Sequence, residues 1–338
     1  MKIKNKKTII IAEAGVNHNG SLKKALKLID AAVEAGANAI KFQTFKAENL
    51  ATDYAPKAEY QKYKSQKKET QLQMLKKLEF TSAMHKACFE KCKKKKIIFI
   101  SSAFDIESLN YLKKFKLSYF KVPSGEITNL PYLEFVGSLG LPVILSTGMS
   151  TLEEVGEALR VLRSAGTDTD RVTVLHCTTE YPAPMETVNL RVMQTISREY
   201  GVAIGYSDHT SGIEVSIAAA ALGARVIEKH FTLDRALPGP DHKASLEPNE
   251  LVALIKAIRN IEIALGDGSK MPSNGENKNK LIARKSIVAR REIHSGDSFT
   301  EDNLTTKRPG TGISPMKWYE ILGQTAGRDY QSDEIIEQ

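Results

Sequence analysis

Ser207, Asp208 and His209 stand side by side in the segment GYSDHTSGIEVS, residues 205–216. The same residue types form the relay of serine hydrolases, in which a histidine deprotonates a serine and a carboxylate orients the histidine. Adjacent residues of an extended segment point to opposite faces, so these three residues cannot form that relay among themselves. The nucleophile-elbow pattern GxSxG is also missing around Ser207. We expect Ser207 and His209 to share one face of a strand end, with Asp208 on the other face as a support.

Two histidines end consecutive strand-like runs, His209 in VAIGYSDHT and His230 in ARVIEKHFT. Imidazoles on neighbouring strand ends predict a metal site. Catalytic zinc usually has three protein ligands, and no third His or Cys is obvious beside this pair. The sequence therefore predicts a more open site for Mn²⁺ or Mg²⁺, with Co²⁺ as a third candidate, completed by water and substrate.

The other histidines and the cysteines form weaker patterns. His85 and His294 are expected on the surface. Cys88 and Cys92 lie four residues apart in a helical pattern, but two thiols without a further His or Cys make a poor zinc site. An odd number of cysteines, three in 338 residues, also argues against a disulfide framework.

Lys41 and Lys121 each lie near the end of an apolar, strand-like run. A buried lysine is costly to desolvate unless an anion meets it. Hydroxyl side chains accompany the two lysines: Ser101, Ser102, Ser124 and Ser146. This combination predicts a clamp for a phosphate group, and the alternative is an ordinary set of strand ends that leave the core into water.

The elements that must position these residues alternate between strand-like and helical patterns from residue 8 to about residue 265. Eight short, β-branched runs are candidate strands: 8–15, 38–45, 96–104, 119–126, 142–149, 171–179, 202–210 and 224–232. Amphipathic stretches between them open with a capping Ser or Thr and close with Gly. Eight such units in about 250 residues predict an α/β fold, a closed (β/α)₈ TIM barrel whose active site lies at the C-terminal ends of its strands. A doubly wound sheet is the alternative, but EAGVNHNG after the first run is not the GxGxxG fingerprint of that fold.

Composition changes sharply after the last helical pattern. Residues 267–280, DGSKMPSNGENKNK, are predicted to be a linker between a barrel domain, 1–266, and a small domain, 281–338. A domain of this size is marginal alone, so we expect it to dock onto the barrel or onto a partner chain. The longest insertion, 46–70, is polar and lysine-rich and forms either part of an active-site wall or a surface excursion.

The overall composition, 41% hydrophobic in 338 residues, is that of a soluble globular protein. No apolar stretch approaches the roughly 18 residues of a membrane span, and Glu13 interrupts the apolar run near the N-terminus, which argues against a secretory signal. We therefore expect a cytoplasmic enzyme without a membrane partner. The net charge of +8 is concentrated in MKIKNKK and KCKKKK, without interleaved aromatic residues, so nucleic acid is not expected and an anionic small substrate is.

Motifs along almost the whole chain resemble the bacterial sialic acid synthases. They are AEAGVNHNG, KFQTFKAENL, PSGEITNLPYL, ILSTGM, LHCTTEYPAP, GYSDHTSGIEV, IEKHFTLDRALPGPDHKASLEP and TKRPGTGISPMKWYEILG. The resemblance implies a (β/α)₈ barrel followed by an antifreeze-protein-like (SAF) domain. It also implies a transferase that condenses phosphoenolpyruvate with a 2-acetamido sugar and releases phosphate by C–O cleavage.

The resemblance also implies a role for individual residues. Phosphoenolpyruvate would be held by Lys41, Ser102, Lys121, Ser124, Ser146, Thr179 and Ser207. The sugar would meet Gln43, Tyr181, Asp241 and Arg308. The catalytic group would comprise Glu13, Glu126 and His209, and the metal would be held by His209 and His230. Arg308 would reach the barrel of a second subunit, which implies a domain-swapped homodimer.

Two departures from the family pattern lie at the phosphate site. Ser101-Ser102-Ala103-Phe104 stands where many relatives have Ser-Thr-Pro-Phe, and Thr179 stands where some have Asn. The expected acceptor is N-acetylmannosamine, giving N-acetylneuraminic acid; the alternative is 2,4-diacetamido-2,4,6-trideoxymannose, giving N,N'-diacetyllegionaminic acid. A metal-dependent barrel aldolase or hydrolase, and a carbohydrate- or ice-binding protein built on the terminal domain, are the rival interpretations.

Overall fold

Eight parallel strands form a closed barrel in the order of the chain. They are β1 Ile9–Gly15, β2 Ala39–Thr44, β3 Ile98–Ala103, β4 Phe120–Val122, β5 Val143–Ser146, β6 Val172–Cys177, β7 Ala203–Asp208 and β8 Val226–His230. β8 pairs with β1 and closes the barrel, with Glu13 beside His230. This computed structural model describes residues 7–57 and 70–337, and it confirms the predicted TIM barrel.

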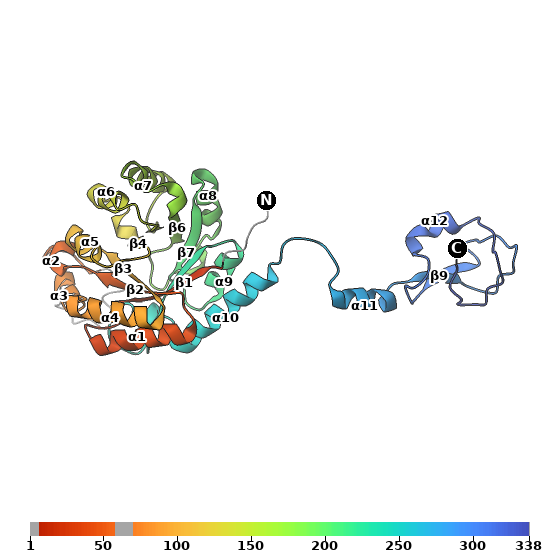
Figure 1. Cartoon of the computed structure of the whole chain (residues 1–338), viewed down its shortest axis with the longest axis horizontal. Helices are drawn as coiled ribbons and strands as arrows, with labels where there is room; N and C mark the ends of the chain where they lie inside the picture. Colours follow the sequence, from red (N-terminus) through yellow and green to blue (C-terminus); the bar gives the residue numbers. More distant parts are fainter. Residues whose placement is uncertain (1–6, 58–69, 338) are drawn as a thin grey trace. The chain divides into compact units, whose positions relative to one another are not determined.

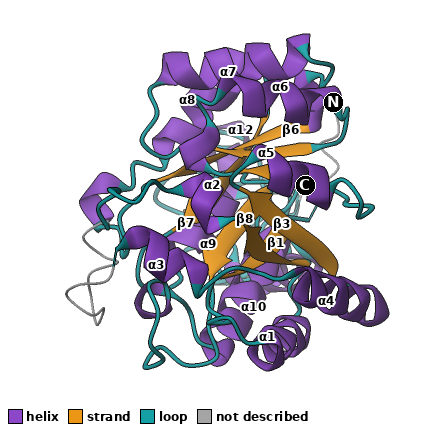
Figure 2. Ribbon diagram, turned by 90° about the vertical axis from the view of Figure 1, so that its left-hand side faces the viewer, coloured by secondary structure: helices purple, strands orange, loops and turns teal. Residues whose placement is uncertain are grey.

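Helices enclose the barrel on its outside, as Figures 1 and 2 show. They are α1 Leu22–Ala35, α4 Ser82–Lys95, α5 Ile106–Leu112, α6 Leu130–Ser138, α7 Leu152–Ser164, α8 Arg191–Tyr200, α9 Glu214–Ala221 and α10 Pro248–Ala264. Capping follows the expected chemistry: the side chains of Ser21 and Thr151 accept from backbone amides in the first turns of α1 and α7. Gly36 ends α1 with a φ of 84°, a left-handed conformation that favours glycine.

The barrel interior contains an apolar layer. Ile11, Ala39, Ile100, Ile144, Leu175 and Val226 form one buried cluster. Successive residues of a strand alternate between faces, so the residue two positions further along shares the inward face. Those inward residues are Glu13, Lys41, Ser102, Ser146, Cys177 and Glu228. The same pleat therefore places an apolar layer directly beneath a layer of reactive side chains.

The expectation for His85 is wrong, because this side chain is buried. Its Nε2 lies 2.7 Å from Thr44 Oγ1, and its Nδ1 lies 3.0 Å from the Thr81 carbonyl oxygen. The ring also packs edge-on against Phe80. Helix α4 turns this face toward the barrel, which a lysine-rich helix sequence does not reveal.

Two short helices follow β2, α2 Ala47–Leu50 and α3 Gln71–Lys76. They belong to the predicted insertion, 46–70, and to the residues just after it; residues 58–69 of that insertion lie outside the described residues. Side chains from this region and from the loops after β1 and β3 form a separate apolar cluster, which we call the apolar wall. Its members are Val16, Phe45, Leu50, Met74, Leu75, Leu78 and Phe104.

The chain divides into two compact units, Met1–Asp267 and Gly268–Gln338. The second contains α11 Asn274–Ala283, the antiparallel strands β9 Ser286–Ala289 and β10 Leu304–Lys307, and α12 Trp318–Ile321. Residues 267–280, predicted as a linker, thus include most of a helix. Ile287, Phe299 and Leu304 belong to this unit's own core. Across 7–57 and 70–337, none of the helices has the length and apolar character needed to cross a membrane.

Candidate active site

A cavity of about 540 Å³ opens at the C-terminal ends of the barrel strands. Every strand contributes at least one side chain to it. These strand residues are Glu13, Lys41, Gln43, Ser102, Lys121, Ser146, Cys177, Ser207, Glu228 and His230. The loops that follow the strands add the other predicted residues: Ser124, Thr179, Tyr181, His209 and Asp241. Glu126 is not among the lining residues, and Arg308 is exposed in the second unit.

Two buried lysines meet two buried carboxylates on the floor of this cavity. Lys41 Nζ lies 2.8 Å from Glu228 Oε1 and 3.5 Å from Glu13 Oε1. Lys121 Nζ lies 3.9 Å from the same Glu228 oxygen. Glu228 Oε1 also accepts a hydrogen bond of 3.0 Å from Ser207 Oγ. The second oxygens of Glu13 and Glu228 are buried without a hydrogen-bond partner, so both carboxylates keep acceptor capacity for a ligand.

Burial and these charges set the protonation states of the floor. Burial raises the pKa of Glu13 to about 7 despite the opposing charge of Lys41, and Glu228 adds to the rise. Burial alone would also raise the pKa of Glu228, but Lys121 and Lys41 outweigh it and lower that pKa to about 2. For Lys41, burial favours the neutral form, yet the carboxylates of Glu13 and Glu228 hold its pKa above the usual value. The floor therefore combines a permanently ionised carboxylate with one that titrates near neutral pH.

Hydroxyl groups surround the second lysine. Lys121 Nζ donates 2.6 Å to Ser146 Oγ and 3.1 Å to the Val122 carbonyl oxygen. Ser124 Oγ accepts a hydrogen bond of 2.9 Å from the backbone amide of Gly148. A Cβ atom at Gly148 would lie only 2.4 Å from Thr179 Cγ2, so this position has no room for a side chain. Ser102 Oγ is buried without a hydrogen-bond partner. An ammonium group with free or movable hydroxyls around it is suited to bind an anion.

His209 and His230 lie together, with ring centroids 5.6 Å apart. His209 Nδ1 donates 2.5 Å to the Thr178 carbonyl oxygen, which leaves the lone pair on Nε2. Burial lowers the pKa of His209 to about 4. Burial, the neighbouring His209 and Lys41 hold the pKa of His230 well below its usual value. Both imidazoles are thus neutral at physiological pH, the state in which a histidine binds a metal.

The residues around this pair fit an open divalent-metal site. His230 Nδ1 is buried without a hydrogen-bond partner, and the unpartnered oxygen atoms of Glu13 and Glu228 belong to the same cavity. Among the residues that the structure describes, no group of three or more His, Cys, Asp or Glu side chains is arranged to hold a metal ion. Two neutral nitrogen donors with nearby carboxylates suit a metal that takes its remaining ligands from substrate and water.

Asp208 and Lys229 alternate with these functional residues on β7 and β8 and face away from the cavity. Asp208 Oδ2 lies 2.9 Å from Lys229 Nζ, and both side chains are fully buried. Asp208 also accepts 2.6 Å from Ser216 Oγ and 2.9 Å from the amide of Thr210. The expected supporting role of Asp208 is confirmed, and its ion pair ties together the two strands that carry the histidines.

Gln43 and Asp241, two of the residues predicted to meet a sugar, lie near the end of β1. Gly15 has a φ of 50°, and a Cβ there would lie 3.3 Å from Gln43 Nε2 and 3.5 Å from Asp241 Oδ2. Gln43 Nε2 donates 3.2 Å to Glu13 Oε1. Burial raises the pKa of Asp241 to about 6. The centroids of the Tyr181 and His209 rings lie 4.3 Å apart, which connects this polar cluster to the imidazoles.

Glu126 does not lie where the sequence predicts it, and Glu228 has contacts that the sequence does not predict. Glu126 lies at the end of a 3₁₀ turn, Ser124–Glu126, and its Oε2 accepts 2.6 Å from Asn129 Nδ2 instead of lining the cavity. Glu228 received no role from the sequence, although its spacing from His230 places both on one face of β8. In the structure it contacts both lysines and is central to the floor.

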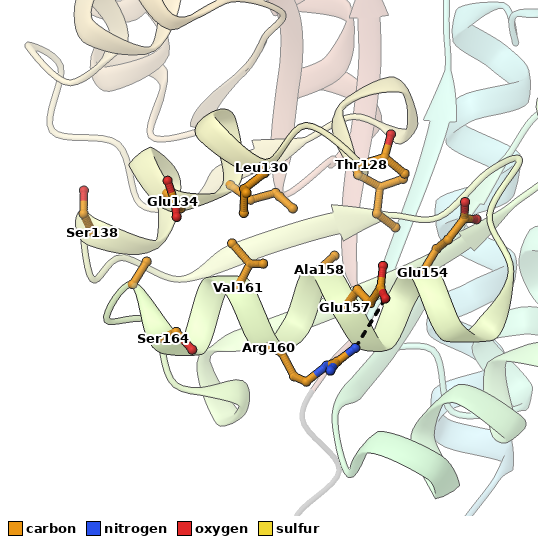
Figure 3. A pocket seen from close by; sticks show the side chains of 13 residues that line it. Thr128, Leu130, Glu134, Ser138, Glu154, Glu157, Ala158, Arg160, Val161 and Ser164 are labelled. Carbon is orange, nitrogen blue, oxygen red and sulfur yellow. Dashed lines mark ion pairs between the residues drawn. The ribbon is translucent and has the colours of Figure 1, made fainter.

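A second hollow, of about 680 Å³, lies between α6 and α7 on the outside of the barrel. Figure 3 shows Leu130 and Val161 along it and the Arg160–Glu157 ion pair at its edge. It contains none of the predicted site residues, and none of its charged side chains is buried. This hollow lacks the groups that chemistry requires.

Comparison with known proteins agrees with the geometry of the barrel. The NeuB family model matches residues 28–270, and the SAF domain model matches residues 284–338. An N,N'-diacetyllegionaminic acid synthase of Campylobacter jejuni is 54% identical over 98% of this chain and 99% of its own length. One from Legionella pneumophila is 46% identical over 93% and 89%. The crystal structure of a sialic acid synthetase from Leptospira borgpetersenii, 36% identical, superposes with a TM-score of 0.73 over 81% of this chain and 90% of its own. The chain belongs to the NeuB family and ends in a SAF domain.

Proposed function

We propose that this chain is a synthase of N,N'-diacetyllegionaminic acid. It would condense phosphoenolpyruvate with 2,4-diacetamido-2,4,6-trideoxymannose and release phosphate. The observation that carries the choice of acceptor is the identity of 54% and 46% to two synthases of this product, against 36% to the sialic acid synthetase. This reverses the order of the two acceptors that the sequence motifs suggested, because those motifs are shared by both kinds of synthase.

The charged floor is the proposed donor site. Phosphoenolpyruvate carries a phosphate and a carboxylate, and Lys41 and Lys121 supply two ammonium groups for them. Ser102, Ser124, Ser146, Thr179 and Ser207 would add hydrogen bonds to its oxygens. Glu228 contacts both lysines before the donor arrives, so neither buried ammonium group is unpaired in the empty site.

The reaction forms one carbon–carbon bond, and at C2 a carbon–oxygen bond to water replaces the carbon–oxygen bond to phosphate. The methylene carbon of phosphoenolpyruvate attacks the aldehyde carbon of the open-chain sugar, and positive charge develops at the pyruvyl C2. The aldehyde oxygen takes up a proton and becomes a hydroxyl group. Water adds at C2 and loses a proton, and phosphate leaves with the bridging oxygen. Glu13 is the proposed proton acceptor for the added water, since its raised pKa, about 7, allows proton transfer near neutral pH.

His209 and His230 would hold the divalent metal, Mn²⁺, Mg²⁺ or Co²⁺. When bound, such a metal supplies Lewis-acid polarisation of the sugar carbonyl. The hydrogen bond from His209 to Thr178 fixes the imidazole tautomer that this requires. Glu126 is proposed only as a support of the loop that carries Ser124, because its carboxylate is bonded to Asn129.

Gln43, Tyr181 and Asp241 are the proposed contacts of the acceptor sugar. Arg308 would contact the sugar from the SAF domain of a second copy, in a domain-swapped homodimer. The family resemblance supports this arrangement. A cytoplasmic location is proposed as well, because phosphoenolpyruvate is a cytoplasmic metabolite.

Rates with two acceptors test the proposal directly. Phosphate release is measured with phosphoenolpyruvate plus N-acetylmannosamine and with phosphoenolpyruvate plus 2,4-diacetamido-2,4,6-trideoxymannose. We expect release only when both substrates are present and a higher kcat/KM for the diacetamido sugar. A higher kcat/KM for N-acetylmannosamine would contradict the legionaminic assignment, and release without a sugar would contradict the synthase reaction.

A further inference from the structure

The active-site cavity has two chemically different sides, and only one of them is explained by the donor and the metal. The charged floor includes Lys41 on β2, and the apolar wall adds Leu50, Met74, Leu75 and Phe104 to the same cavity. We propose that this wall selects the acceptor by contacting apolar substituents at its C4 and C6 positions, an inference that rests on the proposed function.

The wall is an integral part of the cavity. Met74 is buried, Leu50, Leu75 and Phe104 are partly buried, and all four line the cavity. These residues come from α2, from α3 and from the loop after β3, and they pack on Val16 and Phe45 as one cluster. Three separate segments therefore present a continuous apolar surface to the substrate space.

Phosphoenolpyruvate does not account for this surface. Its phosphate and carboxylate need ammonium and hydroxyl groups, which other lining residues of the cavity supply. A large apolar surface beside an anion site calls for a second substrate that carries apolar groups. Gln71, at the start of α3, is the polar exception among the lining residues of the two short helices.

The two candidate acceptors differ in the polarity of their C4 and C6 groups, which an apolar surface can distinguish. N-acetylmannosamine presents hydroxyl groups at C4 and C6, which would lose water against leucine and methionine without gaining a hydrogen bond. The diacetamido sugar presents a methyl group at C6 and an acetamido methyl at C4. An apolar pocket distinguishes such groups by about 10- to 200-fold in kcat/KM for each methyl-sized difference. We therefore expect the wall to contribute at least one factor of this size to acceptor choice.

Leu75→Asn is the variant that tests the wall. Leu75 is only partly buried on a six-residue helix, so a polar side chain can be placed there without opening the barrel core. The ratio of kcat/KM for the diacetamido sugar to that for N-acetylmannosamine should fall by about tenfold or more. The KM for phosphoenolpyruvate should stay at the wild-type value, because Leu75 is not among the proposed donor contacts.

Three further variants make the result specific. Leu75→Met keeps an apolar side chain of similar volume and should retain the wild-type ratio. Leu130→Asn makes the same chemical change at the exposed first residue of α6, outside the active-site cavity, and should also retain the wild-type ratio. Leu50→Asn provides a second position in the wall, with the same expected fall, if Leu75→Asn fails to fold.

The outcomes separate this inference from the proposed function. Wild-type preference for N-acetylmannosamine would contradict the proposed function, while the change of ratio in Leu75→Asn could still be measured. A wild-type preference for the diacetamido sugar, with an unchanged ratio in folded Leu75→Asn and Leu50→Asn, would overturn the role of the wall alone. Equal losses with both acceptors would assign these leucines to packing and would also overturn it.

Discussion

Lys121 is the residue whose charge makes donor binding depend on pH. Burial, helped by the charge of Lys41 and opposed by Glu228, lowers its pKa to about 8. The second pKa of a phosphate monoester lies near 6, so the donor is already fully charged at that pH. The protonated lysine exists below its pKa, and kcat/KM for phosphoenolpyruvate should therefore fall about tenfold per pH unit above 8.

A pH profile of kcat/KM from pH 6 to 10 measures this effect. Lys121→Arg is the informative variant, because a guanidinium group stays protonated throughout the range. Its profile should lack the alkaline fall, even if its overall rate is lower. An alkaline fall of the same midpoint in Lys121→Arg would assign the titration to another group.

Glu228 and Glu126 show where residue-level reasoning from the sequence succeeds and stops. Alternation along β8 places Glu228 on the face of His230, but only the closed barrel shows that it contacts lysines on β2 and β4. Glu126 closes a run that the sequence predicts as a strand. The chain leaves the extended conformation at Ser124, so the alternation that would have aimed Glu126 inward no longer holds.

At the scale of elements, the ion pair between β7 and β8 holds two site-bearing strands in register. Asp208 and Lys229 are cross-strand partners, and neither charge reaches solvent. Lys229→Met should lower the free energy of unfolding by about 3–5 kcal/mol, because it leaves a buried carboxylate without its counter-ion. Urea denaturation followed by circular dichroism measures the change.

Lys86→Met is the matched control for that experiment. Lys86 is exposed on α4, and the same substitution there should change the free energy of unfolding by less than about 0.5 kcal/mol. Equal effects of the two substitutions would show that the Asp208–Lys229 pair contributes nothing beyond ordinary lysine truncation.

At the scale of the whole molecule, the proposed site is complete only when two copies meet. Arg308→Ala leaves the barrel intact, and His209→Ala leaves the SAF domain intact. If Arg308 acts across the dimer, a mixed dimer has one complete site of two, and the isolated mixed dimer should have about half of wild-type activity although each parent is inactive.

Co-expression of the two variants, with separate tags to isolate the mixed dimer, measures the restoration. Each variant alone provides the baseline. A mixed dimer no more active than the sum of its parents would place Arg308 in its own barrel or outside the site.

The sequence by itself determined the barrel, the strand positions and the polar residues at the strand ends. Each depends on local regularity: β-branched runs, helix caps, and a two-residue period that puts Glu13 above Ile11 and Lys41 above Ala39. Tertiary structure alone decided the contacts of Glu228, the burial of His85 and the assembly of the apolar wall from Val16, Leu50 and Phe104. These features join segments that are far apart in the chain, and the period of a strand or helix specifies the face of a residue but not the neighbour that the fold brings to it.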